Sequence, residues 1–489
     1  MHLAILIIYI FLLLIIFCYS LVQLSLLFNY LKWKRTKSIN SPVFNFENLA
    51  EIPQITIQLP IYNEKYVAKR LIKQICELEY PTEKLEIQVL DDSTDASAEK
   101  NKALVEAFQQ KGIDISYIHR ENRKGFKAGA LKEGLATAKG EFIAIFDADF
   151  LPEKDWLQKT IPYFKDEKIG VVQTRWGHLN KEHSILTKVQ AFALDFHFVL
   201  EQVGRNFGNH FINFNGTAGV WRKSCILDAG NWQGDTLTED LDLSYRAQLK
   251  GWKFKYLLDV ETPAELPIVI SAARSQQFRW NKGAAENFQK NFFTLLQQKQ
   301  LKWSNKIHAF FHLLNSSLFA VILALALLSI PVLYIKATTP EWNWLFYIMA
   351  FLGLSTFIFI IVYGFTYRKM EGEKAGFWKF IGLFLSFFSI AMGMSVNNTK
   401  AIVEGHFGKK SGFVRTPKFN SVQKKKINVK AFNKVYFSWE NSIEFLLIFY
   451  FIFGIYSAFK LNDFGLLPFH LMLLFGFGFI SYKSLFSKS

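Results

Sequence analysis

The sequence has 489 residues, of which 51% are hydrophobic and 51 are phenylalanine, and its formal net charge is +16. This composition is too apolar for an ordinary soluble enzyme of the same length, so we expect a membrane protein. Basic residues gather beside the apolar segments, which favours membrane lipids over nucleic acid as the partner. The three cysteines lie far apart and form neither a disulfide framework nor a metal-thiolate motif.

The first apolar segment, residues 2–31, exceeds the ~20 residues that span a bilayer, so residues 1–32 are predicted to form an N-terminal transmembrane helix. It lacks the basic start and the small-residue end of a cleaved signal peptide. The stretch KWKRTK follows it, and because Lys and Arg favour cytosolic loops, the N-terminus is predicted to lie outside and the next region inside. Residues 45–305 contain no further span and are predicted to be a cytosolic domain.

Strand-like and helical patterns alternate at the start of this domain. The strand-like runs are ITIQLP (55–60), LEIQVLD (85–91), ISYIHR (115–120) and EFIAIFDAD (141–149). This alternation predicts an α/β fold with a largely parallel sheet, in which ligands bind beyond the carboxyl ends of the strands. No glycine-rich phosphate loop follows a strand, which argues against the usual dinucleotide and ATP sites.

Polar residues follow three of these strands, in LPIYNE (59–64), VLDDSTD (89–95) and FDADF (146–150). Asp147 and Asp149 flank Ala148, and both carboxylates can turn to one Mg²⁺ or Mn²⁺, which binds through carboxylates plus substrate phosphates. Such a pair is also common by chance in turns. Asp91 and Asp92 equally fit turn residues that end a strand.

Cations gather at the start of the next predicted helix, in NRKGFKAGALKEG (122–134). There Lys127 can meet an anion beside free backbone N–H groups. For Arg123 and Lys124, a solvated basic turn is the simpler interpretation.

Two further helices carry candidate site residues. In TEDLDLSYRAQLKGW (238–252), Thr238 is predicted to cap a helix whose apolar stripe contains Leu241, Tyr245 and Leu249. The helix dipole by itself explains acids in the first turn of this helix. A functional explanation is needed only if other polar groups converge on them. In the second helix, within 271–300, Gln276, Arg279 and Trp280 share one face that suits a sugar and a diphosphate. A helix lying on the membrane surface is the competing interpretation, and both can hold, because residues near 271–300 are predicted to form an interfacial helix.

The C-terminal third is predicted to return to the membrane. Two transmembrane helices are expected within residues 306–368 and two more within 437–489. Between them, residues 375–436 are expected to hold an interfacial element and a loop. Because a very basic stretch follows the apolar run at 377–396, residues 377–403 are predicted to form an interfacial or re-entrant element rather than a full span.

The motifs DDSTD, DAD, TED and QQFRW occur in this order between the predicted spans. This combination resembles the membrane-embedded processive glycosyltransferases of family 2, the cellulose synthase superfamily. Residues 213–256 look like the plant cellulose synthase-like A and C groups, which make mannan, glucomannan and xyloglucan backbones. The resemblance covers about 50–420. It implies a GT-A, Rossmann-like cytosolic domain between transmembrane helices and an inverting enzyme that extends a polysaccharide from a nucleotide sugar, with Mg²⁺ or Mn²⁺.

The resemblance also implies roles at matching positions. Asp240 would be the general base within the catalytic motif Thr238–Glu239–Asp240, and Asp147 and Asp149 would hold the metal. The segment FVRTPK (413–418) looks like a gating loop that closes over the nucleotide, with Arg415 in place of the usual Val. The residues expected on the substrate are Pro60, Tyr62, Asn63, Glu64, Asp91, Asp92, Lys127, Asp147, Phe214, Asn215, Gly216, Thr217, Gln276, Arg279, Trp280, Phe413, Thr416 and Lys418.

The sequence leaves several choices open. The donor is GDP-mannose, GDP-glucose or UDP-glucose, and accessory subunits are not specified. The main alternative function is a non-processive transfer of sugar to a lipid such as ceramide or polyprenyl phosphate. A different class is a transport or scaffolding membrane protein without catalysis. A bacterial inner membrane is expected ahead of a Golgi membrane.

Overall fold

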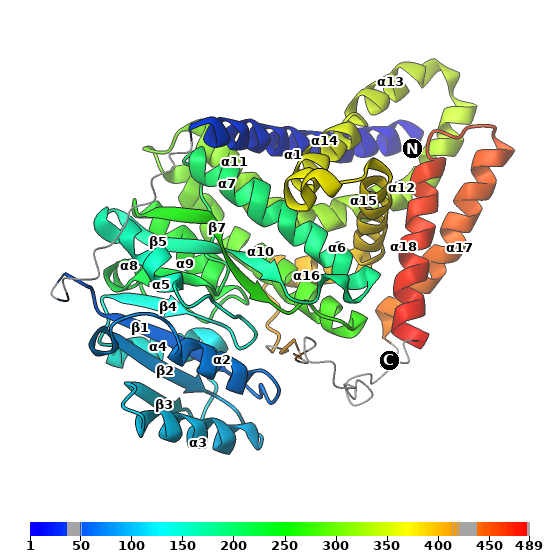
Figure 1. Ribbon diagram of the computed structural model, residues 1–489. Coiled ribbons are helices and arrows are strands. Elements are labelled where there is room, and N and C mark those ends of the chain that lie inside the picture. The colour runs from blue at the N-terminus through cyan, green and yellow to red at the C-terminus, as the bar shows by residue number, and fades with distance from the viewer. Residues whose placement is uncertain are drawn as a thin grey trace.

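The computed structural model describes residues 1–36, 49, 51–412, 414–416, 418, 420 and 438–486. A sheet with its covering helices forms one side of the molecule, and long apolar helices form the other (Figure 1). The strands are β1 (Ile55–Ile61), β2 (Leu85–Asp91), β3 (Ile115–His119), β4 (Phe142–Ile145), β5 (Ile169–His178), β6 (Gly219–Arg222) and β7 (Lys253–Ala264).

These strands form one sheet in the order β3-β2-β1-β4-β6-β5-β7. Strand β6 runs antiparallel to β4 and β5, whereas the other pairings are parallel. The expected α/β fold with a largely parallel sheet is therefore confirmed. Ile61 lies opposite Asp91, and Gln58 lies opposite Ile145. This register brings the segments that follow β1, β2 and β4 to the same edge of the sheet.

Helices cover both faces of the sheet. Leu71, Ile75 and Trp156 belong to the core on one face, and Leu131 and Leu243 belong to the core on the other. The helices of this region are α2 (Ala68–Cys76), α3 (Ser97–Gln109), α4 (Phe126–Thr137), α5 (Trp156–Thr160), α6 (Ile185–Asp195), α7 (Gln202–Phe207), α8 (Lys223–Asp228) and α9 (Glu239–Leu249), with a π-helix at Phe196–Glu201.

Helix α9 buries the apolar stripe expected from the sequence. Tyr245 is fully buried, and Leu241 and Leu249 pack against the same core cluster. Thr238 occupies the N-cap position, but its side chain makes no capping bond, so that part of the expectation is wrong. Its hydroxyl instead accepts a hydrogen bond from Asn287 Nδ2 at 3.0 Å, because α10 (Ile270–Gln297) packs directly against the start of α9.

Four helical segments of the described chain are long and apolar enough to cross a membrane: α1 (His2–Thr36), Trp303–Thr338, Pro340–Glu371 and α17 (Trp439–Lys460). The second contains α11 (Trp303–Leu314) and α12 (Leu318–Thr338), and the third contains α13 (Asn343–Leu352) and α14 (Ser355–Glu371). Helix α18 (Leu467–Phe486) packs beside α17 without belonging to the four. How these helices lie in a membrane stays a prediction.

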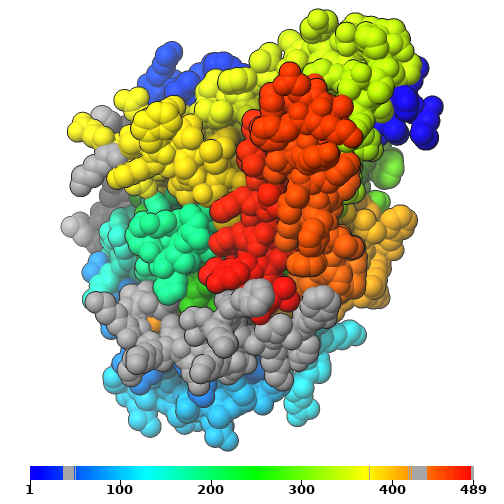
Figure 2. All heavy atoms as spheres, turned by 90° about the vertical axis from the view of Figure 1, so that its right-hand side faces the viewer, coloured from blue at the N-terminus to red at the C-terminus, as the bar shows by residue number. Residues whose placement is uncertain are grey.

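The region predicted to be interfacial or re-entrant is a bent helix pair. Helices α15 (Phe377–Gly393) and α16 (Ser395–His406) meet at 52°, a geometry of either a broken span or a re-entrant loop. Helices α17 and α18 form an outer face of the molecule (Figure 2). On α17, Leu446 and Phe449 are 65% and 56% exposed, as expected for side chains that face lipid.

Candidate active site

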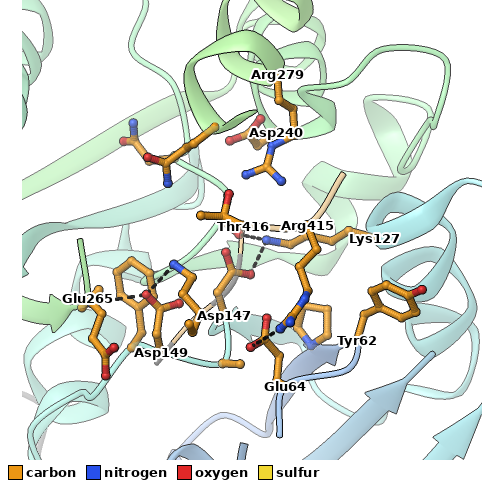
Figure 3. A pocket seen from close by; sticks show the side chains of 18 of the residues that line it. Tyr62, Glu64, Lys127, Asp147, Asp149, Asp240, Glu265, Arg279, Arg415 and Thr416 are labelled. Atoms are coloured by element: carbon orange, nitrogen blue, oxygen red, sulfur yellow. Dashed lines mark hydrogen bonds and ion pairs between the residues drawn. The ribbon is translucent and has the colours of Figure 1, made fainter. Parts of the chain in front are cut away.

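A cavity that is partly open to solvent lies where the carboxyl edge of the sheet meets α9, α10 and the residues Arg415, Thr416 and Lys418 (Figure 3). The residues that the sequence singled out and that line this cavity are Pro60, Tyr62, Glu64, Asp92, Lys127, Asp147, Asp149, Asn215, Gly216, Thr238, Glu239, Asp240, Gln276, Arg279, Trp280, Thr416 and Lys418. The structure therefore brings together residues from all the motifs identified in the sequence.

Four of the expected substrate residues do not line the cavity: Asn63, Asp91, Phe214 and Thr217. Phe413 lies outside the described residues. Asp91 is fully buried, and its carboxylate accepts hydrogen bonds from Ser93 N at 2.8 Å and Asn101 Nδ2 at 2.8 Å. These contacts are those of a turn residue at the end of β2, which the sequence allowed as the alternative.

Asp240 lies in the first turn of α9, at the wall of the cavity. Its Oδ1 accepts a hydrogen bond from Leu241 N at 2.9 Å. Burial, and then the charge of Glu239, raise the pKa of Asp240 to about 7, although Lys127 opposes this shift. A carboxyl group with this pKa can take up and release a proton near neutral pH, which is what a general base requires.

Gly216 faces Asp240 from the loop between α7 and β6. Its φ is +80°, and a Cβ at this position would lie 3.1 Å from Asp240 Oδ2. Both the backbone conformation and the close approach therefore favour glycine. The Gly216 carbonyl accepts a hydrogen bond from Lys127 Nζ at 2.9 Å, which links the loop to the start of α4.

Lys127 pairs with the first carboxylate of the D-x-D motif. Its Nζ lies 2.5 Å from Asp147 Oδ1. Burial lowers the pKa of Lys127, but the charges of Asp147 and Glu239 raise it by more than burial lowers it. The net shift of this pKa is upward, so the ammonium group stays charged. The backbone N–H of Asp147 donates to Thr217 Oγ1 at 2.8 Å. Thr217 thus acts from behind the cavity wall by holding the Asp147 backbone.

Asp149 is 1% exposed, and its Oδ2 accepts a hydrogen bond from Lys418 Nζ at 2.7 Å. Burial raises the pKa of Asp149, although Lys418 opposes the shift. Within the described part of the chain, no three His, Cys, Asp or Glu side chains gather in a metal-binding group. Asp147 and Asp149 nevertheless fit a hard divalent cation that takes its other ligands from phosphate and water, because both offer carboxylate oxygens at the cavity.

A second ion pair joins Arg415 to the segment that follows β1. Arg415 Nη1 lies 2.8 Å from Glu64 Oε2 (Figure 3). Burial raises the pKa of Glu64 to about 7, although Arg415 and Lys418 lower it. The sequence indicated Arg415 only as a departure from the usual Val. Its partner could not be found from local patterns, because the two residues lie about 350 positions apart.

The basic turn after β3 also contributes to the cavity. Arg120 Nε donates to Asp92 Oδ1 at 2.7 Å, and Arg120 Nη2 bonds the other carboxylate oxygen. The guanidinium of Arg123 lies 3.3 Å from the ring centroid of Tyr62, and Arg123 lines the cavity. The expectation of a solvated turn is therefore wrong for Arg123, because the neighbouring loop supplies an aromatic ring on which it stacks.

The face of α10 expected from the sequence also lies at the cavity. Gln276, Arg279 and Trp280 line it together, with Arg279 near Asp240 in Figure 3. Burial lowers the pKa of Arg279, whereas Glu239, Asp147 and Asp240 raise it, so three carboxylates act on this guanidinium.

Sequence reasoning missed Trp176, His178 and Glu265, which also line the cavity. Trp176 and His178 lie at the carboxyl end of β5, and Glu265 follows the end of β7. The rule that directed attention to the residues after β1, β2 and β4 would have found them if these two strands had been predicted.

A family model described as "Glycosyltransferase like family 2" matches residues 53–283. Glucomannan 4-β-mannosyltransferase 2 of Arabidopsis thaliana is 36% identical over 415 residues, which cover 80% of this chain and 73% of that protein. The chain belongs to glycosyltransferase family 2.

Rice relatives of this family 2 chain are more similar over a shorter region. Probable glucomannan 4-β-mannosyltransferase 11 of Oryza sativa subsp. japonica is 46% identical over 267 residues, which cover 53% of this chain and 46% of that protein. The chain spans about half the length of the first rice relatives that it matches. These relatives are plant proteins, and nothing in them supports the expected preference for a bacterial inner membrane.

A solved structure supports the family 2 fold. The mannosyltransferase PcManGT from Pyrobaculum calidifontis, in complex with GDP-Man and Mn²⁺, is similar with a TM-score of 0.55. It is 19% identical, and the match covers 83% of this chain and all of that one. The expected GT-A fold is thereby confirmed.

Proposed function

We propose that this protein is a membrane-embedded, inverting glycosyltransferase that transfers hexose from a nucleotide sugar to a growing β-glycan. The observation that carries the proposal is the arrangement of charge in the cavity. Asp240 lies on one side beside Arg279, and Asp147 and Asp149 lie on the other (Figure 3). A base and a group that binds a leaving diphosphate on opposite sides of one sugar suit direct displacement with inversion.

The proposed reaction uses Asp240 to take the proton of an acceptor hydroxyl. The hydroxyl oxygen then forms a bond to the anomeric carbon of the donor sugar, and the bond from that carbon to the diphosphate breaks. Arg279 and Lys127 both line the cavity and carry positive charge. They would therefore stabilise negative charge on the leaving diphosphate. The proton stays on Asp240 until solvent removes it, which its pKa of about 7 allows.

We infer that a divalent cation assists this reaction. Asp147 and Asp149 would hold it together with the diphosphate, and it would neutralise charge on the leaving group. Lys418 Nζ lies 2.7 Å from Asp149 Oδ2, so this carboxylate already has one cationic group beside it at the cavity. PcManGT, whose fold is similar, was solved with Mn²⁺.

The proposed donors are GDP-mannose and GDP-glucose, with UDP-glucose as the remaining choice. The names of the plant relatives, glucomannan 4-β-mannosyltransferases, support a mannose or glucose donor and a β-1,4-linked product. The exposed apolar helices support an integral membrane location, with the catalytic domain in the cytosol as the charge rule predicts.

The proposal is tested by incorporation of radiolabelled sugar into product by the detergent-purified protein. GDP-mannose, GDP-glucose and UDP-glucose are offered separately with Mg²⁺ or Mn²⁺, and the product is digested with β-1,4-mannanase or β-1,4-glucanase. We expect a polymer that one of these enzymes degrades. A short product that extracts into organic solvent would show transfer to a lipid instead, and no transfer from any donor would contradict the proposal.

A further inference from the structure

A chain of buried polar side chains runs from helix α1 to the loop that carries Asn215. Gln23 of α1 donates Nε2 to Glu201 Oε1 at 2.9 Å. Glu201 Oε2 lies 2.9 Å from His197 Nδ1, and His197 Nε2 lies 3.0 Å from Asn215 Nδ2. Gln23 is fully buried and Glu201 is 3% exposed. This row of hydrogen-bonded side chains therefore connects a predicted membrane helix to the wall of the cavity.

Glu201 fixes the direction of the hydrogen bonds that it accepts from Gln23 and His197. Burial alone would raise the pKa of Glu201, but Arg205 and then His197 lower it to about 2, so it is a carboxylate that only accepts. His197 Nδ1 therefore donates to Glu201, and in the neutral imidazole Nε2 is the nitrogen that accepts from Asn215 Nδ2. Gln202 Nε2 donates to Asn215 Oδ1 at 2.7 Å. The Asn215 amide group therefore donates to His197 through Nδ2 and accepts from Gln202 through Oδ1, and these two bonds fix its orientation.

The backbone around this chain is tightly constrained. His197 and Glu201 lie in the π-helix Phe196–Glu201, a rare conformation that is frequent at functional sites. The following helix α7 contacts α1 directly, because a Cβ on Gly204 would lie 2.5 Å from the carbonyl oxygen of Leu26. Little space is therefore left for the segment that carries His197 to shift relative to α1.

Asn215 lies at the cavity beside the proposed base. It lines the cavity and precedes Gly216, whose Cβ position is 3.1 Å from Asp240 Oδ2. An amide has two N–H groups and two lone pairs, and His197 and Gln202 use one of each. One donor and one acceptor remain for a ligand hydroxyl. Asn215 and Gly216 are adjacent, so a glycan that reaches Asp240 meets the loop that carries this amide.

We propose that His197 and Glu201 are positioning residues that hold the Asn215 amide for an oligosaccharide acceptor, with helix α1 as their support. The proposal rests on the proposed function, because it assumes that a glycan enters this cavity. It assigns to a membrane helix a part in binding the acceptor, in addition to anchoring the chain.

The experiment measures binding of mannohexaose, cellohexaose and GDP to the detergent-purified full chain by calorimetry. The variants are His197→Ala, Asn215→Ala, the double variant, and His197→Gln, which restores a hydrogen-bond acceptor for Asn215. His210→Ala is the matched control, since His210 Nδ1 also bonds an asparagine, Asn305, at 2.8 Å and does not line the cavity.

We expect His197→Ala and Asn215→Ala each to weaken hexaose binding about tenfold, or about 1.4 kcal/mol. The double variant should be no weaker than the worse single variant, because His197 acts through Asn215. GDP binding should stay within about twofold in every variant, His197→Gln should recover most of the hexaose affinity, and His210→Ala should match the wild type.

The proposal is overturned if the wild type binds neither hexaose, if His197→Ala binds as the wild type does, or if the two losses are additive. A parallel loss of GDP affinity would overturn it as well, because it would indicate general damage to the fold. Binding needs no turnover. Failure of sugar transfer with these binding effects intact would therefore count against the proposed reaction and leave the positioning role supported.

Discussion

At the scale of single residues, the charge of Asp240 is set by two opposing influences. The first turn of a helix favours a carboxylate, whereas burial and the neighbouring carboxylate of Glu239 disfavour it. Burial and Glu239 prevail, since the pKa rises to about 7. The same group is therefore a good proton acceptor near neutral pH and a source of instability once it is ionised.

The substitution Asp240→Asn separates these two properties. We expect the transfer rate to fall by ~10²–10⁴-fold, because a positioned general base contributes about this much. The melting temperature at pH 8 should not fall and should rise slightly, since the neutral amide has no charge to desolvate. Asp235→Asn is the control, because Asp235 precedes the same helix but its side chain is 57% exposed. A folded Asp240→Asn variant with most of its rate would contradict the assignment.

The pH dependence follows from the sign of the same shift. The folded-state pKa of Asp240 lies above its ordinary value of 3.8, so the carboxyl favours the folded state most below pH 3.8 and loses this contribution as the pH rises through about 7. Catalysis needs the ionised carboxylate, so activity rises with pH over the range in which the stability contribution of this carboxyl falls. We predict that kcat/KM for the acceptor declines tenfold per unit as the pH falls below about 7. A flat profile between pH 5 and 8 would exclude Asp240 as the titrating base.

At the scale of elements, two ion pairs hold Arg415 and Lys418 to the segments that follow β1 and β4. Arg415 pairs with Glu64, and Lys418 pairs with Asp149. We predict that Arg415→Val raises the KM for the donor by roughly fivefold to tenfold with little change in kcat, because the charged hydrogen bond that positions the segment is lost. Val414→Ala is the control, since Val414 is 63% exposed. An unchanged KM for the donor in Arg415→Val would contradict a role of the Arg415–Glu64 ion pair in donor binding.

The contact between α9 and α10 is a second feature at this scale. A Cβ on Gly283 would lie 2.5 Å from Thr238 Oγ1 and 2.9 Å from Thr238 N. Gly283→Ala should therefore push α10 away from the catalytic turn and lower both the melting temperature and the rate, with a cost of ~1–3 kcal/mol. Gly382→Ala, another helical glycine, should be harmless because its Cβ would meet nothing within 4 Å. Equal effects of the two substitutions would argue against a close contact.

Sequence reasoning worked well where local patterns decide the structure. The predicted strand at 85–91 is β2, and the spacing of Leu241, Tyr245 and Leu249 gave the buried stripe of α9. It failed where partners come from distant segments. The pairing of Arg415 with Glu64 depends on how the whole chain folds back, and no periodic pattern marks it.

At the scale of the whole molecule, the apolar helices and the α/β domain form one connected structure rather than two separate parts. Helix α10 packs against α9 at the cavity and against α16, and Arg274 of α10 lies 2.8 Å from Glu444 of α17. The cavity is thus built partly by elements that continue into the predicted membrane region.

The central claim is that Asp240 drives transfer with inversion of the anomeric carbon. It is tested most directly by NMR of the product made from GDP-α-mannose labelled with ¹³C at C1, or from the matching glucose donor, by the wild type and by Asp240→Asn. The wild type should form only β-linked sugar, and Asp240→Asn should form almost none. An α-linked product, or a β-linked product from both proteins at similar rates, would contradict the claim.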